Sequence, residues 1–141
     1  MNPESNEGND MKHLAARQIE ALTTLMRERT RFLAARIREE LLASDEQHYR
    51  DLAGAVTDTA DEALASTIID MDTEIADRHV TELRDINAAH ARIKDKTYGT
   101  CIGCGDAIAY ERLAAYPTAK RCVICQQQHE HDHPRPGRPR L

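Results

Sequence analysis

All four cysteines of the chain lie in two Cys-x-x-Cys pairs, Cys101 with Cys104 and Cys122 with Cys125. The 17 residues 105–121 separate the pairs, which is a spacing typical of a four-thiolate zinc site built from two short knuckles. Four thiolates saturate a tetrahedral Zn²⁺ and leave no open position for substrate or water. We therefore expect one structural zinc ion per chain, bound by these four cysteines.

Two glycines lie in the first knuckle. Gly103 and Gly105 suit a tight backbone with positive φ, and they let amide N–H groups approach the charged sulfurs. The alternatives to zinc are two disulfides or a redox dithiol. Residues 1–20 contain no apolar run and predict no signal peptide, so we expect a cytoplasmic chain with reduced thiols. A redox dithiol needs one pair only, so the paired spacing favours zinc.

The composition favours long helices over a large globular core. The 141 residues include one Phe, four Tyr and no Trp, and 30% of them are charged. This suits one domain with an extended arm, whose helices share a narrow apolar seam. No run of 18 apolar residues predicts a membrane span. The net charge of −5 argues against attraction to nucleic acid over the whole surface.

The charge is unevenly distributed along the chain. Residues 45–77 contain ten acidic residues and one basic residue, Arg50, for a local balance of −9. Residues 27–38 carry five arginines against one glutamate, and the tail 134–140 is wholly basic. The acidic segment is either a solvated surface that maintains solubility or a surface that meets something positive, such as a basic cleft or a metal ion.

Two helical patterns precede the cysteines. The first predicts a helix over about 11–53, with Gly54 just past its end and a break near Ser44 as the main alternative. The second runs from 58 to 98 without Pro or Gly. The apolar stripes are Leu14, Leu22, Leu25, Met26, Leu33, Ile37 and Leu41 in the first, and Leu64, Ile68, Met71, Ile75, His79, Leu83, Ile86 and Ile93 in the second.

Two such helices joined by a short linker predict a long antiparallel coiled-coil hairpin, in a mainly α fold with the small zinc module at its base. The expected organisation is a disordered N-terminus (1–10), the hairpin (11–97) with its tip near 55–63, and the zinc module with a short C-terminal helix (98–130). A disordered, basic, Pro-rich tail follows (131–141). Residues 129–133 could bind metal ions adventitiously, but we interpret them as a polar entry to the tail.

The zinc module resembles that of the DksA/TraR family of bacterial zinc-finger regulators. The resemblance rests on residues 98–105 (YGTCIGCG), 112–119 (RLAAYPTA) and 122–125 (CVIC). It extends upstream to residues 58–63 (DTADEA), which match the family's tip pattern Asp-x-x-Asp-x-Ala, and it covers about residues 15–128. The length and the long N-terminal helix are similar to the DksA type rather than to the shorter TraR type.

The resemblance implies a regulator that binds RNA polymerase without sequence-specific DNA contact. The coiled coil would enter the secondary channel, and an acidic tip of Asp58, Asp61 and Ala63 would approach the catalytic centre and alter open-complex stability. Guanosine tetraphosphate often assists such proteins, and Arg78 is retained as a polymerase or nucleotide contact. At other matching positions this chain has Asp85, Tyr116 and Gln126, which cannot pair with phosphate as Lys or Arg would. We therefore expect weak or absent dependence on that nucleotide.

Helix capping is a second reading of the tip. Asp58 is a favoured N-cap, and Asp61 lies three residues later, as in a capping box. That role can coexist with function, and it does not explain the surrounding charge of −9. Two carboxylates could also suggest acid–base catalysis, but no nucleophile or pocket-forming sequence accompanies them, and we do not expect an enzyme.

Two further classes of function compete with the polymerase-binding regulator. The first is a nucleic-acid-binding zinc module that uses Arg112, Lys120, Arg121 and the tail, and binding with a steep salt dependence would reveal it. The second is a coiled-coil adaptor that dimerises through its seam. An intramolecular hairpin should instead be monomeric.

Overall fold

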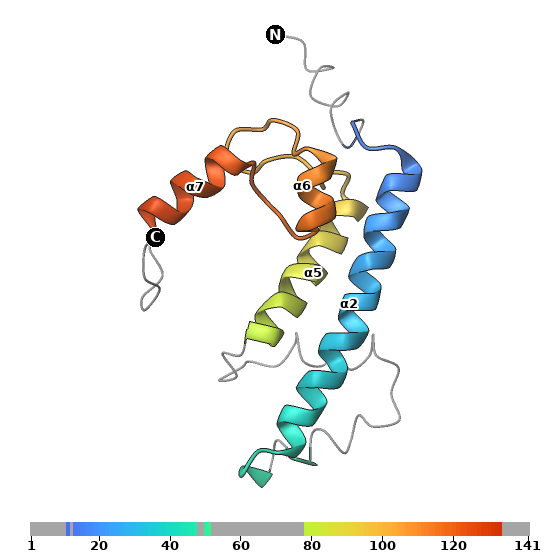
Figure 1. Cartoon of the computed structure of the whole chain (residues 1–141), viewed down its shortest axis with the longest axis vertical. Helices are drawn as coiled ribbons and strands as arrows, with labels where there is room; N and C mark the ends of the chain where they lie inside the picture. The colour runs from blue at the N-terminus through green and yellow to red at the C-terminus, as the bar shows by residue number, and fades with distance from the viewer. Residues whose placement is uncertain (1–10, 12, 48–49, 52–77, 134–141) are drawn as a thin grey trace.

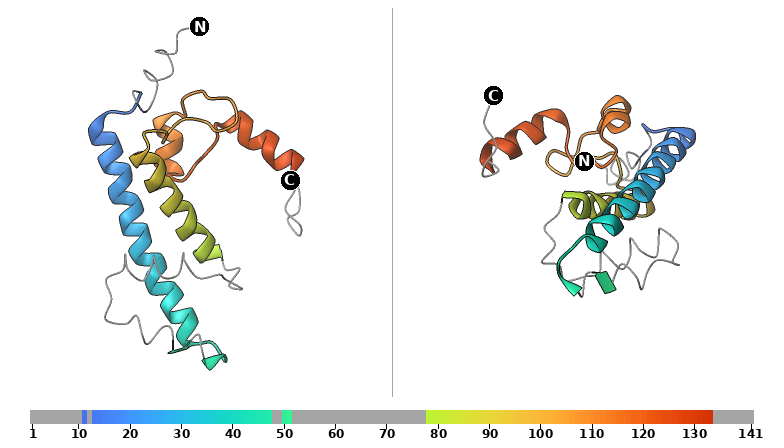
Figure 2. Two further views of the ribbon diagram at one scale, coloured as in Figure 1. Left: turned by 180° about the vertical axis from the view of Figure 1, so that it is seen from behind. Right: turned by 60° about the horizontal axis from the view of Figure 1, so that its bottom comes forward.

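The computed structural model describes residues 11, 13–47, 50–51 and 78–133. Within them the fold is mainly α, with helices α2 (Ala16–Leu42), α5 (Arg78–Lys94), α6 (Tyr110–Ala115) and α7 (Val123–Asp132). The β structure in this part of the chain is one isolated antiparallel bridge, between Thr100 and Ala107. Helices α2 and α5 lie side by side and antiparallel, α6 packs near the start of α2, and α7 points away from the pair (Figure 1). The reverse view shows the same pairing (Figure 2).

Helix α2 presents one apolar face to α5. Its buried side chains follow three-, four- and seven-residue spacings and are Leu22, Met26, Leu33, Ala34, Ile37 and Leu41. The facing side chains of α5 are Val80, Leu83, Ile86 and Ala89. The coiled-coil seam predicted from the sequence is thus confirmed for the described part of the hairpin. One predicted seam residue is wrong, because Leu25 is 45% exposed while its neighbour Met26 takes the buried position.

The first helix is shorter than the predicted 11–53. It begins at Ala16, where the Gln18 side chain accepts a hydrogen bond from the Ala15 N–H (2.8 Å). It ends at Leu42, and a turn built around Ser44 follows. The Ser44 hydroxyl accepts the Glu46 N–H (3.2 Å), and the Ser44 carbonyl accepts the Arg50 guanidinium (2.7 Å). The alternative of a break near Ser44 is the correct one, because these local bonds compete with helical ones.

The C-terminal helix is longer than predicted, because α7 continues to Asp132 and takes in two residues assigned to the tail. Side-chain pairs four residues apart support this extension: Gln126 donates to Glu130 (2.9 Å) and Gln128 donates to Asp132 (3.1 Å). The predicted tip near 55–63, the N-terminus 1–10 and the whole of the predicted second helix before residue 78 lie outside the described residues.

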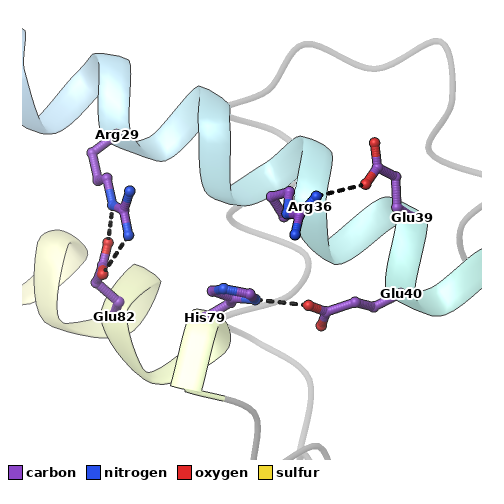
Figure 3. A network of polar contacts seen from close by, with 6 residues as sticks. All are labelled: Arg29, Arg36, Glu39, Glu40, His79 and Glu82. Atoms are coloured by element: carbon purple, nitrogen blue, oxygen red, sulfur yellow. Dashed lines mark hydrogen bonds and ion pairs between the residues drawn. The ribbon is translucent and has the colours of Figure 1, made fainter.

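Polar pairs connect the two helices along the margin of the seam (Figure 3). The Arg29 guanidinium on α2 donates two hydrogen bonds to the Glu82 carboxylate on α5, one of them 2.9 Å long. Nearer the end of α2, His79 Nδ1 lies 2.7 Å from a carboxylate oxygen of Glu40. These contacts fix the relative position of the helices at two points.

Among the described residues, no helix combines the length and the apolar character that crossing a lipid bilayer requires.

Candidate metal centre

The two knuckles bring all four cysteine sulfurs together. The four Sγ atoms lie within 4.8 Å of one another, and those of Cys104 and Cys122 are 3.9 Å apart. All four cysteines are free thiols, so the disulfide alternative is not realised. Cys101 is buried, whereas Cys104 is exposed at the rim. Four sulfurs converging on one point form a closed tetrahedral donor set, with no place for a substrate ligand.

The first knuckle is a tight backbone turn closed by its own hydrogen bonds. Cys101 N–H donates to the Asp106 carbonyl (2.8 Å), and Gly105 N–H donates to the Cys101 carbonyl (2.9 Å). Gly105 adopts a φ of +79°, which glycine tolerates without strain. The Gly103 N–H points at the Cys101 sulfur (3.3 Å) and so stabilises its negative charge.

Gly103 is required for a different reason from the one predicted. Its φ is not positive, so the backbone there does not need glycine. A Cβ at this position would instead lie 3.1 Å from the sulfur of Cys125 and 3.2 Å from its Cβ. The missing side chain therefore lets the second knuckle approach the first.

The second knuckle is also the start of α7. Cys122 is the N-cap of this helix, and its sulfur accepts a hydrogen bond from the Cys125 N–H (3.5 Å). A helix N-terminus carries a partial positive charge that favours a thiolate. The sequence signal for this arrangement is the Cys-x-x-Cys pair at the start of a helical segment.

Sequence reasoning missed contacts that close the module on itself and one that holds it on the hairpin. Tyr98 is fully buried, and its hydroxyl donates to the Pro117 carbonyl (2.7 Å). His13 Nε2 lies 3.0 Å from the Ile108 carbonyl, which links the segment before α2 to the module. Arg112 Nε donates to the Arg121 carbonyl (2.9 Å) and spans the loop between α6 and the second knuckle. The sequence feature that could have indicated the first of these contacts is Tyr98 itself, an aromatic residue beside the first knuckle in a chain with few aromatics.

The surroundings of the sulfurs shift the pKa values of Cys101 and Cys125 in opposite directions. Burial raises the pKa of Cys101, but hydrogen bonds from the backbones of Cys122, Cys104 and Gly103 outweigh it and lower that pKa to about 6. Neighbouring thiols, Cys122 first, raise the pKa of Cys125 to about 12. Cys101 therefore ionises more readily than Cys125, which keeps its proton in the absence of metal. A bound divalent cation requires thiolate ligands, so metal binding releases the protons that the cysteines carry.

These features fit zinc better than a hard cation. Soft thiolates select Zn²⁺ over Mg²⁺ or Ca²⁺, which prefer oxygen ligands. The backbone N–H groups at the sulfurs match the partners that orient thiolates in zinc sites. The cofactor of this fold is a structural Zn²⁺, and its role is to connect the two knuckles.

The other predicted site residues are the tip residues and Arg78, and the structure describes only Arg78. Asp58, Asp61 and Ala63 lie outside the described residues. Arg78 is exposed and is the first residue of α5.

The three residues that replace expected basic side chains lie in or near the base. Asp85 lies 3.8 Å from the Lys120 ammonium, which joins α5 to the module. Tyr116 is 49% exposed, with the Arg112 guanidinium 5.9 Å from its ring centre. Gln126 donates to Glu130.

A helical hairpin with a C4 zinc module at its base defines the class of protein, and comparison with known proteins gives the family. Residues 96–131 match the model of the prokaryotic dksA/traR C4-type zinc finger. The solved structure of a DnaK suppressor protein from Agrobacterium tumefaciens is 30% identical, with a TM-score of 0.55 over 78% of this chain and 92% of that one. The chain belongs to the DksA/TraR family.

Curated relatives match over shorter stretches. General stress protein 16O of Bacillus subtilis is 34% identical over 93 residues, which is 66% of this chain and 51% of that protein. The RNA polymerase-binding transcription factor DksA of Caulobacter vibrioides is 36% identical over 73 residues, 52% of this chain and 51% of that protein. The chain thus spans about half the length of these curated relatives.

Proposed function

We propose that this protein is a transcription regulator that binds RNA polymerase through the secondary channel and acts there through an acidic coiled-coil tip. The observation that carries the proposal is the combination of an antiparallel helical hairpin with the family's C4 module at its base. A relative that matches residues of this chain is named for binding RNA polymerase. The tip of Asp58, Asp61 and Ala63 would modulate open-complex stability near the catalytic centre.

The base and the hairpin are suited to act as one rigid probe. Buried residues of α2, α5 and the zinc module belong to one continuous apolar core, from Leu41 through Leu22 to Tyr98 and Leu113. A rigid base can fix where a distant tip is delivered. Ile102, Val123 and Ile124 remain more than half exposed beside the cysteines and offer an apolar edge for docking.

The rival functions gain less support. Two basic residues of the nucleic-acid hypothesis already have partners, since Arg112 spans the module's loop and Lys120 pairs with Asp85. The adaptor hypothesis needs a seam that is free to dimerise. The described seam is instead filled within one chain, because Leu33, Ile37 and Leu83 are at most 1% exposed. We therefore expect a monomer, and sedimentation equilibrium would test this.

Co-purification with core RNA polymerase tests the binding step directly. The tagged, zinc-loaded full chain should retain the polymerase, and a peptide that competes for the secondary channel should release it. A salt-sensitive complex with DNA in the absence of polymerase would support the zinc-module rival instead.

Substitution of the tip tests the mechanism separately from binding. Asparagine caps helices about as well as aspartate, so Asp58→Asn with Asp61→Asn should cost at most the dipole term of roughly 0.3–1 kcal/mol per charge. The double variant should bind polymerase nearly normally and fail to change open-complex lifetime. Unchanged regulation would reduce the carboxylates to caps, and lost binding would make the tip an affinity anchor. Ala63→Thr keeps both charges and tests whether the tip must fit closely.

The co-effector is a separate question. With Asp85, Tyr116 and Gln126 where cations are expected, we propose weak or absent dependence on guanosine tetraphosphate, with Arg78 as the retained cation. In-vitro transcription with a polymerase lacking its other nucleotide site would test this. A large increase in the regulator's effect on adding the nucleotide would contradict the proposal.

A further inference from the structure

The C-terminal end of α7 brings two histidines into contact, His129 in its last turns and His133 at its C-cap. The rings of His129 and His133 are stacked, with centroids 4.6 Å apart and an interplanar angle of 26°. This contact follows from the four-residue spacing, which puts both side chains on one face of the helix. His131 lies two residues from each and therefore points away from that face.

The hydrogen bonding of His133 leaves one ring nitrogen available as a ligand. His133 Nδ1 lies 3.2 Å from the carbonyl oxygen of His129. A carbonyl only accepts hydrogen bonds, so this contact selects the tautomer with the proton on Nδ1. The lone pair is then on Nε2. Metal-binding histidines typically have this arrangement, in which the second nitrogen donates to a carbonyl or carboxylate.

The neighbouring acidic side chains have a different role. Glu130 and Asp132 accept hydrogen bonds from Gln126 and Gln128 one turn earlier. These pairs hold the helix through its last turn, where the His133 N–H donates to the His129 carbonyl (2.8 Å). The carboxylates thus stabilise the backbone that presents the imidazoles.

Helix capping alone does not account for this arrangement. His133 contributes to capping through its backbone N–H and through Nδ1. Neither bond uses Nε2 or requires an aromatic partner at position 129. A pair of imidazoles four residues apart at a helix end is, by contrast, a donor set that transition metals bind, once the rings turn from the stacked position so that both Nε2 lone pairs face one ion.

We propose that His129 and His133 form a second metal site, which binds one divalent transition-metal ion of the kind that prefers imidazole: Cu²⁺, Ni²⁺, Co²⁺ or Zn²⁺. Two imidazoles hold the ion, and water completes its coordination. The site discriminates against Mg²⁺ and Ca²⁺, which prefer oxygen ligands. Affinities follow the general order for nitrogen ligands, with Cu²⁺ above Ni²⁺ and Ni²⁺ above Co²⁺.

The second site is close to the first. Cys125 and His129 lie four residues apart on α7, and His133 follows four residues later as its C-cap. A step of four helical residues advances about 6 Å at 1.5 Å per residue. An exposed two-imidazole site should bind more weakly than four thiolates. The two sites must therefore be distinguished by ligand chemistry as well as by stoichiometry.

Titration of the zinc-loaded full chain with Ni²⁺, followed by calorimetry, tests the proposal. We expect one Ni²⁺ to bind per chain while the original zinc is retained. His129→Gln and His133→Gln should each weaken Ni²⁺ binding about tenfold or more, and His131→Gln, the matched control on another face of α7, should change it by less than about twofold. Glutamine keeps good helix propensity, so α7 should persist in all three variants.

Cobalt adds a spectroscopic readout. Co²⁺ bound by thiolates gives intense charge-transfer bands, whereas Co²⁺ at two imidazoles with water gives only weak visible bands. Added to the zinc-loaded protein, Co²⁺ should give the weak bands, and His129→Gln should remove them.

Three outcomes would overturn the proposal. Equal weakening by His131→Gln would indicate chelation by an unstructured histidine-rich segment rather than by the α7 pair. Thiolate charge-transfer bands would mean that the added metal exchanges into the cysteine cluster. Absence of a one-to-one Ni²⁺ complex at millimolar metal would mean that the stacked pair serves only to end the helix.

Discussion

The zinc base and the hairpin arm of this fold are stabilised by different interactions. In the base, Tyr98, Ile108 and Leu113 are buried, but the path of the chain around the four sulfurs is set by backbone hydrogen bonds. In the arm, α2 and α5 bury a seam of Leu, Met, Ile and Val. The base should therefore depend on metal, and the arm on apolar burial.

The two regions are nevertheless coupled through shared side chains. Leu14 and Leu22 of the arm belong to the same buried cluster as Tyr98, Ile108 and Leu113 of the base. Burial also raises the pKa of Tyr98 to about 12, so its hydroxyl stays a neutral donor to Pro117 over the physiological range. Damage to the base should thus reach the adjacent end of the seam before it reaches the far end.

The largest effect should follow loss of the metal. Removing Zn²⁺ by chelation, or removing one ligand by Cys104→Ser, should unfold the base, because comparable structural sites contribute about 10–16 kcal/mol of apparent binding free energy. Elemental analysis should give one zinc per native chain, and near-ultraviolet circular dichroism should lose the Tyr98 signal. The far-ultraviolet helical signal should fall much less, because the arm does not contain the metal. A native chain without zinc, or an unchanged Tyr98 signal after chelation, would contradict this division.

Removing apolar volume from the arm should have the next largest effect. Leu33 is 0% exposed, so Leu33→Ala should destabilise the chain by about 2–5 kcal/mol. Leu25→Ala removes the same atoms from the same helix at a 45% exposed position, and it should cost less than about 0.5 kcal/mol. Urea unfolding of the zinc-loaded protein measures both. Equal losses would mean that Leu25 is in the seam and that the register of α2 is wrong.

Two glycines in the first knuckle should give separable effects. Gly103→Ala places a Cβ against Cys125 and should weaken zinc binding. Gly105→Ala meets no atom within 4 Å, so its cost should be only the strain of a positive φ, on the order of 1–2 kcal/mol. Competition with a zinc-binding dye measures the first effect, and denaturant unfolding measures the second. Intact zinc affinity in Gly103→Ala would show that the knuckles can separate without loss of the site.

The metal site could be predicted more completely from the sequence than the hairpin could. Cysteine type and spacing nearly determine a C4 site, because few other structures use two such pairs. Helical periodicity identifies which face of a helix is apolar, but not which residues at the margins of that face are buried. Leu25 and Met26 are adjacent on that face, and the angle between α2 and α5 decides which of them is buried.

Local and long-range polar contacts were harder to predict. The break after Leu42 depends on hydrogen bonds between Ser44, Glu46 and Arg50, which compete with helix continuation over a few residues. The anchors of the base, His13 to Ile108 and Tyr98 to Pro117, join residues far apart in the chain. No spacing rule relates such partners.

The pairing of Arg29 with Glu82 is another long-range contact of this kind, and it should give the smallest effect. The guanidinium binds the carboxylate with two hydrogen bonds and raises its own pKa by doing so, and it also lies 4.9 Å from the Phe32 ring centre. This bidentate geometry favours a measurable contribution of the pair to the stability of the fold. Both side chains are, however, more than a third exposed, at 45% and 36%, and solvent screens the attraction.

A double-mutant cycle with Arg29→Gln and Glu82→Gln should give a coupling energy of about 0.2–1 kcal/mol that decreases with added salt. Gln at position 29 keeps part of the packing on Phe32, so the cycle reports the ion pair rather than the aromatic contact. A matched cycle with Arg36→Gln and Glu39→Gln, an exposed pair within α2, should give less, because that pair makes one longer contact (3.4 Å) and joins no second helix. Similar coupling in the two cycles would show that the pair between α2 and α5 does not help to fix the register of the arm, which apolar burial would then have to set alone.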